Sequence, residues 1–222
     1  MAQFPSTQWS LIRRSGETPS ARRQAFGELA GSYRSAIAAY FRARMDASAV
    51  EDATQGFLAA SFEHAWWSRA DAECGSFRGF LLLLLRRHLG HLRELRRLDE
   101  MPMNTTQEHA DPAVGAEHQF DTRFALVLTA RALDGLRQHY AGRGRGELFE
   151  RIVPLLSSPP EYGELTRLAE TLGMPGNTLT VEIKRLRSRL RERLREDLMD
   201  LCADQVAFDS EWSTLQQILG GA

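Results

Sequence analysis

The sequence has few cysteines, no long apolar run and almost no net charge. Cys74 and Cys202 lie far apart, and no histidine stands at a metal-ligand spacing from either, so we expect neither a disulfide framework nor a zinc site. The longest apolar run, from Gly79 to Leu85, is much shorter than the roughly 20 residues that cross a bilayer. The chain does not open on a basic segment followed by an apolar stretch. We therefore expect a cytoplasmic protein.

Patterns typical of catalysis are also missing. The sequence contains no Gly-rich phosphate loop, no nucleophile elbow and no pair of carboxylates at a catalytic spacing. His88 and His91 are close in sequence, but a zinc site needs at least one further protein ligand. We expect a protein that is not an enzyme and that holds no cofactor or metal.

Helical periodicity is the dominant pattern. Hydrophobic residues make up 43% of the 222 residues and recur at spacings of three and four, whereas β-branched residues are sparse. We predict an all-α protein. The expected helices span about residues 21–44, 49–67, 76–98, 122–140, 147–156, 162–172 and 177–202.

A polar stretch from Glu100 to Gln119, with two prolines, interrupts this periodicity. It predicts a flexible linker between two small helical domains, the second ending in a helix-turn-helix. The expected division is an N-terminal extension over residues 1–20, a first domain over 21–99, the linker over 100–121, a second domain over 122–202 and an acidic tail over 203–222.

Charge is segregated along the chain, although the formal net charge is only -1. Seven basic and two acidic residues lie between Gly176 and Arg195, and six acidic residues with no lysine or arginine follow from Glu196 onwards. A net charge near zero argues against a globally basic nucleic-acid binder, but a local basic run can contact phosphates or simply face solvent. Our hypothesis for the acidic tail is that it weakens binding of the free protein to DNA.

The segment from Leu168 to Leu194 predicts two helices that meet at a sharp corner. Gly173 can take the positive φ that ends the first helix, and the small Ala169 permits close approach. The second helix has one apolar stripe and an opposite outward face. The stripe comprises Leu179, Ile183, Leu186, Leu190 and Leu194, and the face includes Val181, Lys184, Arg185, Ser188 and Arg195. A groove-binding helix-turn-helix fits this pattern, as do a solvated helical hairpin and a dimer seam.

Two helices in the first half also carry charge on one side. The segment from Gly75 to Arg97 is apolar on one side, and its other side is lined by Arg86, Gly90, Arg93 and Arg97, with Arg87 and His91 at the edge. This arrangement suits a phosphate track, or a core helix with a solvated face. Glu51, Asp52 and Gln55 lie near the start of another helix, where helix capping alone would explain the two carboxylates.

Taken in order, these segments resemble the bacterial extracytoplasmic-function sigma factors of RNA polymerase. The resemblance rests on "EDATQGF" in the acidic helix, "GSFRGFL" before the basic helix and "LAETLG" at the corner, and it covers Phe26 to Arg97 and Tyr162 to Arg195. The opening "FPSTQWSLIRR" is similar to the start of a subset of that family. Membership implies a protein that breaks no bond itself and directs core RNA polymerase to promoters.

The resemblance also implies a role for each segment. Docking on the clamp of the polymerase large subunit would fall to Glu51, Asp52, Gln55 and Phe57. Melting and holding the minus-ten element would fall to the loop from Asp71 to Gly75 and to Asp71, Arg86, Arg87, His91, Arg93 and Arg97. Reading the minus-thirty-five element would fall to Thr178, Thr180, Val181, Lys184, Arg185 and Ser188.

The chain departs from the family pattern at three positions. Ala49 stands where the family has an aspartate and Gly56 where it has a glutamate, so we expect docking that is weaker or that depends on another feature, such as modification of Thr54. Pro175 replaces a capping serine, so we expect the second helix of the corner to start later, at Asn177.

Two other readings explain part of the sequence. A stand-alone helix-turn-helix regulator would use the corner without polymerase, and a helical adaptor would act through protein contacts alone. The sigma reading predicts core RNA polymerase and promoter DNA as partners, with control by an anti-sigma factor, a regulatory kinase or expression level.

Overall fold

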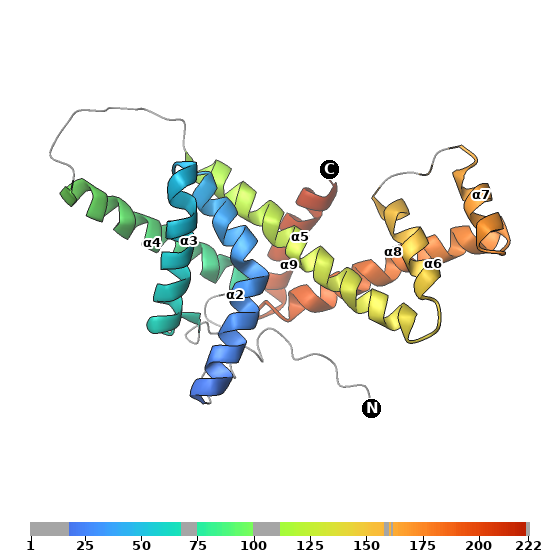
Figure 1. The fold of residues 1–222 in the computed structure, drawn as a ribbon, viewed down its shortest axis with the longest axis horizontal. Coiled ribbons are helices and arrows are strands. Elements are labelled where there is room, and N and C mark those ends of the chain that lie inside the picture. Colours follow the sequence, from blue (N-terminus) through green and yellow to red (C-terminus); the bar gives the residue numbers. More distant parts are fainter. Residues whose placement is uncertain (1–17, 68–74, 100–111, 158–159, 161, 221–222) are drawn as a thin grey trace. The chain divides into compact units, whose positions relative to one another are not determined.

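The all-α prediction is confirmed by the computed structural model, which describes residues 18–67, 75–99, 112–157, 160 and 162–220. Within these ranges the only β-type pairing is an isolated antiparallel bridge between Ser76 and Cys202. The elements, shown in Figure 1, are α2 (Pro19–Arg42), α3 (Ala47–Glu63), α4 (Phe77–Asp99), α5 (Pro112–Ala141), α6 (Gly146–Ile152), the 3-10 helix η3 (Val153–Leu156), α7 (Glu164–Thr171), α8 (Gly176–Met199) and α9 (Gln205–Gly220).

Local signals in the sequence account for where several helices begin. Thr18 caps α2 by accepting a hydrogen bond at 3.1 Å from the Ala21 N–H, and Pro19 follows at the first helical position, where its missing N–H costs nothing. Proline also stands first in α5, at Pro112. Residues 112–121, which we predicted to be linker, are therefore helical, because a proline that interrupts a helix interior is well tolerated as its first residue.

The chain divides into two compact units. Unit 1 contains residues 1–127 together with 198–222, and unit 2 contains residues 128–197. Helix α5 runs from the first unit into the second, and α8 runs back, so unit 2 is an insertion within unit 1. The predicted division into consecutive domains did not anticipate that residues after Asp197 belong to the first unit.

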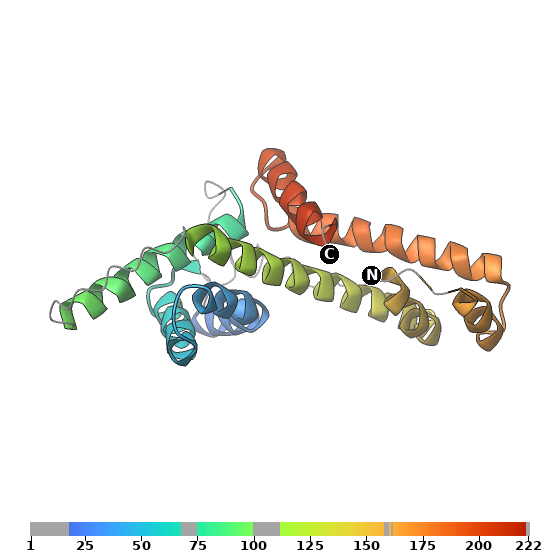
Figure 2. The same cartoon turned by 90° about the horizontal axis from the view of Figure 1, so that it is seen from above.

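Aromatic side chains form much of the core of unit 1. Tyr33 of α2 is fully buried, stacks on Phe124 of α5 with ring centroids 5.2 Å apart and meets Phe77 of α4 at the same distance. Helices α2 and α3 lie side by side in both views (Figures 1 and 2). Such offset and tilted ring contacts stabilise the fold beyond what burial of their apolar area contributes.

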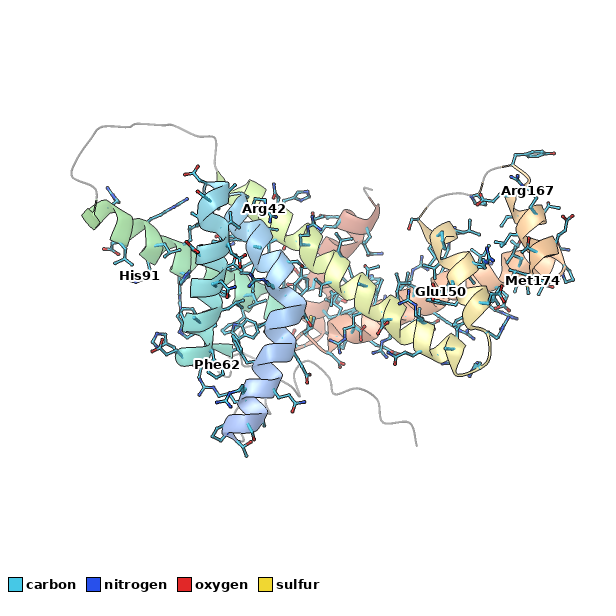
Figure 3. The ribbon with its side chains drawn as sticks, viewed as in Figure 1. Arg42, Phe62, His91, Glu150, Arg167 and Met174 are labelled. Atoms are coloured by element: carbon cyan, nitrogen blue, oxygen red, sulfur yellow. The ribbon has the colours of Figure 1, made fainter. Side chains whose placement is uncertain are left out.

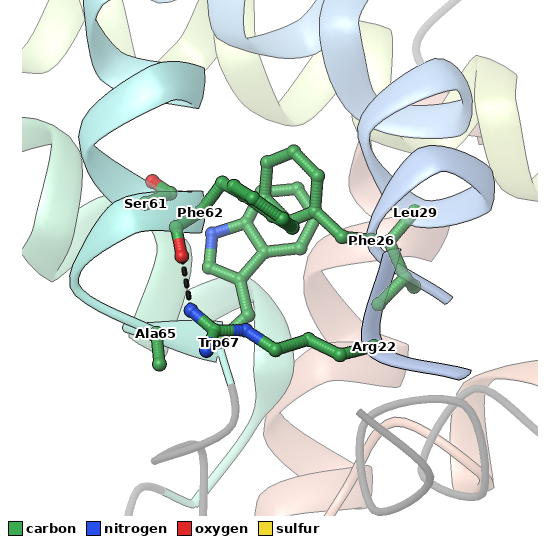
Figure 4. A pocket seen from close by; sticks show the side chains of 7 residues that line it. All are labelled: Arg22, Phe26, Leu29, Ser61, Phe62, Ala65 and Trp67. Atoms are coloured by element: carbon green, nitrogen blue, oxygen red, sulfur yellow. Dashed lines mark hydrogen bonds between the residues drawn. The ribbon is translucent and has the colours of Figure 1, made fainter. Parts of the chain in front are cut away.

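A small pocket lies between the start of α2 and the end of α3 (Figure 4). Phe26 lies between the rings of Phe62 and Trp67, with centroid distances of 5.1 and 4.9 Å. The Arg22 guanidinium lies 5.1 Å from the centre of the Phe62 ring and donates a hydrogen bond to the carbonyl of the same residue. The pocket is thus a small gap between aromatic side chains and the Arg22 side chain, where these two helices pack.

A second core holds unit 2 together. Tyr140 of α5 packs on Phe149 of α6 with ring centroids 5.3 Å apart. The helices α5, α6, α7 and α8 all contribute buried residues to one cluster, which comprises Leu136, Tyr140, Leu148, Phe149, Ile152, Leu155, Ala169, Leu179, Ile183 and Leu186. This core fixes the corner between α7 and α8.

The acidic tail is a folded helix over most of its length. Helix α9 buries Phe208, Glu211 and Leu215 in unit 1. The sequence contains this periodicity, since the apolar residues Phe208, Trp212 and Leu215 recur at spacings of four and three. None of the described helices is long and apolar enough to span a membrane.

Candidate functional surfaces

The corner between α7 and α8 has the backbone geometry that the sequence predicts. Gly173 has φ +60°, and its N–H donates to the Glu170 carbonyl at 3.0 Å, while the Met174 N–H donates to the Ala169 carbonyl at 3.0 Å. Only glycine adopts this φ readily. Ala169 is 3% exposed, as its predicted role in close approach requires.

Helix α8 starts at Gly176, and its Leu179 N–H donates to the Pro175 carbonyl at 3.1 Å. The predicted delay of the helix to Asn177 is wrong by one residue, because a residue that precedes a helix needs only its carbonyl to accept the first helical hydrogen bond. Pro175 can therefore occupy the position of the usual serine without shifting the side chains that follow.

The predicted division of α8 into a buried stripe and an exposed face is confirmed. Leu179, Ile183, Leu186 and Leu194 are at most 7% exposed, and Leu190 packs against the same cluster. All six side chains assigned to the minus-thirty-five element are exposed, namely Thr178, Thr180, Val181, Lys184, Arg185 and Ser188. This face is therefore free to contact another molecule.

A buried carboxylate orients one of these side chains. Glu182 is 3% exposed; its Oε1 accepts a hydrogen bond from Arg185 Nη1 at 2.8 Å, and its Oε2 lies 3.2 Å from Arg145 Nη2. Arg185 is still 60% exposed, so the ion pair engages one nitrogen of its guanidinium while much of the side chain remains accessible. Charge-assisted pairs of this kind fix side-chain direction more than stability when one partner faces solvent.

Several arginines of α8 serve the fold instead of an outer surface. Arg187 donates to the Leu155 carbonyl at 2.8 Å. Arg189 donates to the Tyr140 hydroxyl at 3.2 Å and lies over the same ring, and Arg193 pairs with buried Asp197 at 3.0 Å. Arg189 therefore contacts α5, and Arg193 contacts a carboxylate near the end of α8 itself.

Helix α4 carries the predicted basic face. Arg86, Arg87, His91, Arg93 and Arg97 are exposed, and Figure 3 shows His91 projecting from the ribbon of α4. A Cβ added at Gly90 would meet nothing within 4 Å, so this gap in the face is open. Arg86 pairs with Glu117 of α5 at 2.7 Å. Asp71, the remaining residue assigned to the minus-ten element, lies outside the described residues.

The apolar side of α4 is buried over its first half. Phe77, Leu81, Leu85 and Leu89 are at most 4% exposed. Leu95, further along the helix, is 45% exposed. The helix is therefore packed at its start and more exposed further along, where the predicted basic contacts continue.

Helix α3 presents Glu51, Asp52 and Gln55 to solvent. Gln55 donates to Glu51 at 3.0 Å and Arg34 of α2 pairs with the same carboxylate; the hydrogen bond from Gln55, with the charge of Arg34, lowers the pKa of Glu51. This carboxylate is therefore held in its ionised form on an accessible surface.

Two neighbours on α3 are not accessible. Phe57, predicted to contact the polymerase, is 0% exposed and packs in the core with Phe41 and His88. Thr54 is also 0% exposed, and its hydroxyl donates to the Val50 carbonyl at 2.7 Å. A partner cannot reach Phe57, nor can a modifying enzyme reach Thr54, while α3 is packed in this way.

His88 lies behind the exposed face of α3. Its ring meets Phe41, Phe57 and Trp66 with centroid distances of 5.6 to 6.3 Å, and burial, together with the charge of His91, lowers its pKa. A Cβ at Gly56 would lie 3.9 Å from His88 Nε2. The histidine is therefore a half-buried packing residue whose surroundings favour the neutral ring. The described residues contain no group of three or more potential metal ligands.

The sequence did not reveal a polar cluster at the start of α4. Arg78 pairs with Glu211 of α9 at 2.5 Å and with Asp121 of α5 at 2.6 Å, and Ser76 donates to Glu211 at 2.6 Å. Two of these three contacts join residues more than 100 positions apart, and contacts of that kind leave no periodic pattern in a single sequence. The apolar spacing in α9 was the one available signal that this segment packs against the rest of the protein.

Comparison of the chain with family models, with curated proteins and with solved structures gives no match.

Proposed function

We propose that this protein is a sigma factor of the extracytoplasmic-function type, which binds core RNA polymerase and directs it to promoters in the bacterial cytoplasm. The observation that carries the proposal is the face of α8, where all six side chains assigned to promoter reading are exposed while the opposite stripe is packed. Residues near the start of such a helix can reach base edges when the helix lies in a major groove.

Two further surfaces support the proposal. The basic side of α4 is accessible for the phosphates of a melted strand, and α3 offers Glu51, Asp52 and Gln55 for docking on the polymerase clamp. A stand-alone regulator would need only α8. A near-zero net charge also suits a factor that binds DNA within a larger complex, because it limits non-specific affinity for phosphates.

The accessible part of the docking surface is smaller than the resemblance implies. Phe57 supports α3 from within the core, so the proposed contacts with the clamp come from Glu51, Asp52 and Gln55. Control by an anti-sigma factor remains compatible with all three surfaces. Control through phosphorylation of Thr54 requires that α3 first unpack, since this hydroxyl is buried.

Docking is tested by size-exclusion chromatography of the chain mixed with bacterial core RNA polymerase. We expect co-elution for the unaltered protein and at least a tenfold loss of affinity for Asp52→Ala combined with Gln55→Ala. Glu63→Ala, at the exposed far end of the same helix, is the matched control and should bind normally. A chain that does not bind core polymerase is not a sigma factor.

Promoter reading is tested separately with Lys184→Ala combined with Arg185→Ala. We expect this variant to bind core polymerase normally but to lose promoter selection, because each good contact with a base edge contributes roughly 1–3 kcal/mol of discrimination. Arg151→Ala, an exposed arginine on α6 of the same unit, should leave selection unchanged. Tight sequence-specific binding by the free protein, without polymerase, would instead favour the stand-alone regulator.

A further inference from the structure

The segment after α8 returns to the start of α4 and pairs with its backbone. The Ala203 N–H donates to the Gly75 carbonyl at 2.8 Å, and the Phe77 N–H donates to the Leu201 carbonyl at 2.9 Å. Ser76 and Cys202 therefore face each other as a non-hydrogen-bonded antiparallel pair. Ser76 lies within the "GSFRGFL" motif that carries part of the family resemblance.

Helix α9 then places a carboxylate on this motif. Glu211 is 7% exposed; its Oε1 accepts a hydrogen bond from the Ser76 hydroxyl at 2.6 Å and its Oε2 accepts one from Arg78 Nε at 2.5 Å. A hydroxyl and a guanidinium at the start of a long helix are groups that bind anionic oxygens. The carboxylate of Glu211 thus occupies a position that the oxygens of a phosphate group would also suit.

The polar groups under α9 keep a partner if Glu211 leaves. Ser76 Oγ also accepts a hydrogen bond from the Gly79 N–H at 3.0 Å, and Arg78 also pairs with Asp121 at 2.6 Å. Departure of Glu211 would also separate its carboxylate from that of Asp121, since both now pair with the Arg78 guanidinium. The usual penalty for breaking a buried ion pair, an uncompensated charge, is therefore avoided at this site.

The apolar contacts of α9 are limited to one stripe. Phe208 is 1% exposed and Leu215 is 4% exposed, whereas Val206 is 79% and Leu219 is 40% exposed. Towards its end the helix borders an open hollow lined by Glu117, His118, Asp121, Thr214, Gln217 and Ile218. The docked segment is thus held by its buried apolar side chains, the short backbone pairing and the Glu211 contacts. Those side chains are Leu198, Leu201, Cys202, Phe208 and Leu215.

We propose that residues 198–220 form a releasable latch, which covers Ser76 and Arg78 in the free protein and gives way there to a phosphate of the promoter strand. The inference rests on the proposed function for the identity of the incoming ligand. Release of the latch is a property of the protein alone. An internal carboxylate competing with a nucleic-acid phosphate would suppress binding by the free chain without any global positive charge.

The latch can be locked covalently, because Cys202 already stands opposite Ser76. Opposed residues of a non-hydrogen-bonded pair have Cα atoms roughly 4.5 Å apart, within the range of about 4.4–6.8 Å that disulfides span. We expect Ser76→Cys, in a Cys74→Ser background, to form a disulfide with Cys202 on oxidation, detected by mass spectrometry. Failure to form it would contradict the docked geometry and overturn the proposal.

The locked and reduced forms are compared for binding to core polymerase and to a single-stranded minus-ten oligonucleotide in the resulting complex. We expect equal binding to core, at least a tenfold loss of oligonucleotide binding when locked, and recovery with dithiothreitol. The Cys74→Ser protein under the same oxidation is the control for oxidant damage, and Ser76→Ala reports the effect of losing the hydroxyl. Equal oligonucleotide binding by both forms would show that the segment is a permanent part of the fold.

Hydrogen exchange separates failure of the latch from failure of the proposed function. In the free, unaltered protein, we expect amides of α9 to exchange at least tenfold faster than those of α2 around Tyr33, because a latch opens without unfolding unit 1. Equal exchange in the two helices would overturn the latch whatever the partner is. If α9 exchanges fast but the protein does not bind core polymerase, then the proposed function fails and the latch stands.

Discussion

The burial of some side chains in this protein could be predicted from the sequence, whereas that of others depends on contacts between separate helices. Phe57 lies in a segment on which the family resemblance rests, yet it follows Val50, Ala53 and Thr54 at helical spacings and shares their buried side of α3. That periodicity was readable in the sequence. The burial of Glu182 was not readable in the sequence, because its partner Arg145 lies outside α8. Local periodicity does not predict a contact between separate helices.

Glu182 is expected to stabilise unit 2 through its two arginines. Replacement by alanine should lower the free energy of unfolding by about 1–2 kcal/mol, the range for hydrogen bonds to a charged group, reduced because both arginines are partly solvated. Urea denaturation measures the change. Glu170→Ala, on the exposed side of α7, should have almost no effect, and an equal loss in both variants would contradict this assignment.

The pH dependence of stability should reflect Asp121. Burial, partly offset by Arg78, raises the pKa of its carboxyl above the ordinary 3.8. Between the ordinary pKa of Asp121 in the unfolded chain and its raised pKa in the folded protein, the folded state binds more protons than the unfolded state. The contribution of Asp121 to stability therefore falls as pH rises between these two pKa values. Asp121→Asn should remove that component from the dependence of unfolding free energy on pH. An unchanged pH profile would contradict the assignment.

Cys202 offers a direct chemical probe of the docked segment. Burial, with the nearby charges of Glu211 and Asp204, raises the pKa of its thiol to about 12. Because the thiolate is the reactive form, modification by a thiol reagent at pH 8 should be slow in a Cys74→Ser protein. Glu211→Ala should accelerate it by weakening the docking of α9. Equal rates in the two proteins would show that Glu211 does not hold the segment in place.

At the level of whole helices, hydrophobic periodicity predicted which segments are helical and which side of a helix is buried. It predicted less well where each helix begins and ends. The buried stripe of α8 was correct because its residues repeat at helical spacing and pack on one core. Helix α5 begins about ten residues before the predicted start, at Pro112, since a polar, proline-containing stretch can still form a first turn. Helix α9 was not predicted: Phe208, Trp212 and Leu215 recur there at helical spacings, but the acidic charge of the segment is equally typical of a solvated tail.

The corner between α7 and α8 depends on one backbone conformation. Gly173→Ala places a Cβ at φ +60°, which should cost about 1 kcal/mol of stability in unit 2. The same variant should weaken promoter selection, because α8 would no longer be set at its present angle to α7. Thermal unfolding measures the first effect. Gly176→Ala, where a Cβ meets nothing within 4 Å, is the control; an equal destabilisation there would point to a general effect of side-chain addition.

At the scale of the whole molecule, the order of segments along the chain does not match the order of folded units. Residues 198–222 belong with residues 1–127, so unit 2 is an insertion. No local pattern predicts that return, because the contacts that define it join Ser76 and Arg78 to a residue near the other end of the chain. The sequence did predict the chemistry of the surfaces, since the basic face of α4 and the outward face of α8 are both exposed.

The central claim is most directly tested by run-off transcription. Bacterial core RNA polymerase is incubated with the purified chain and fragmented genomic DNA of the organism that encodes it, and the transcript 5′ ends are mapped. We predict discrete start sites preceded by a shared pair of promoter elements, absent without the chain and lost with Lys184→Ala combined with Arg185→Ala. Start sites that are the same with and without the chain would contradict the claim.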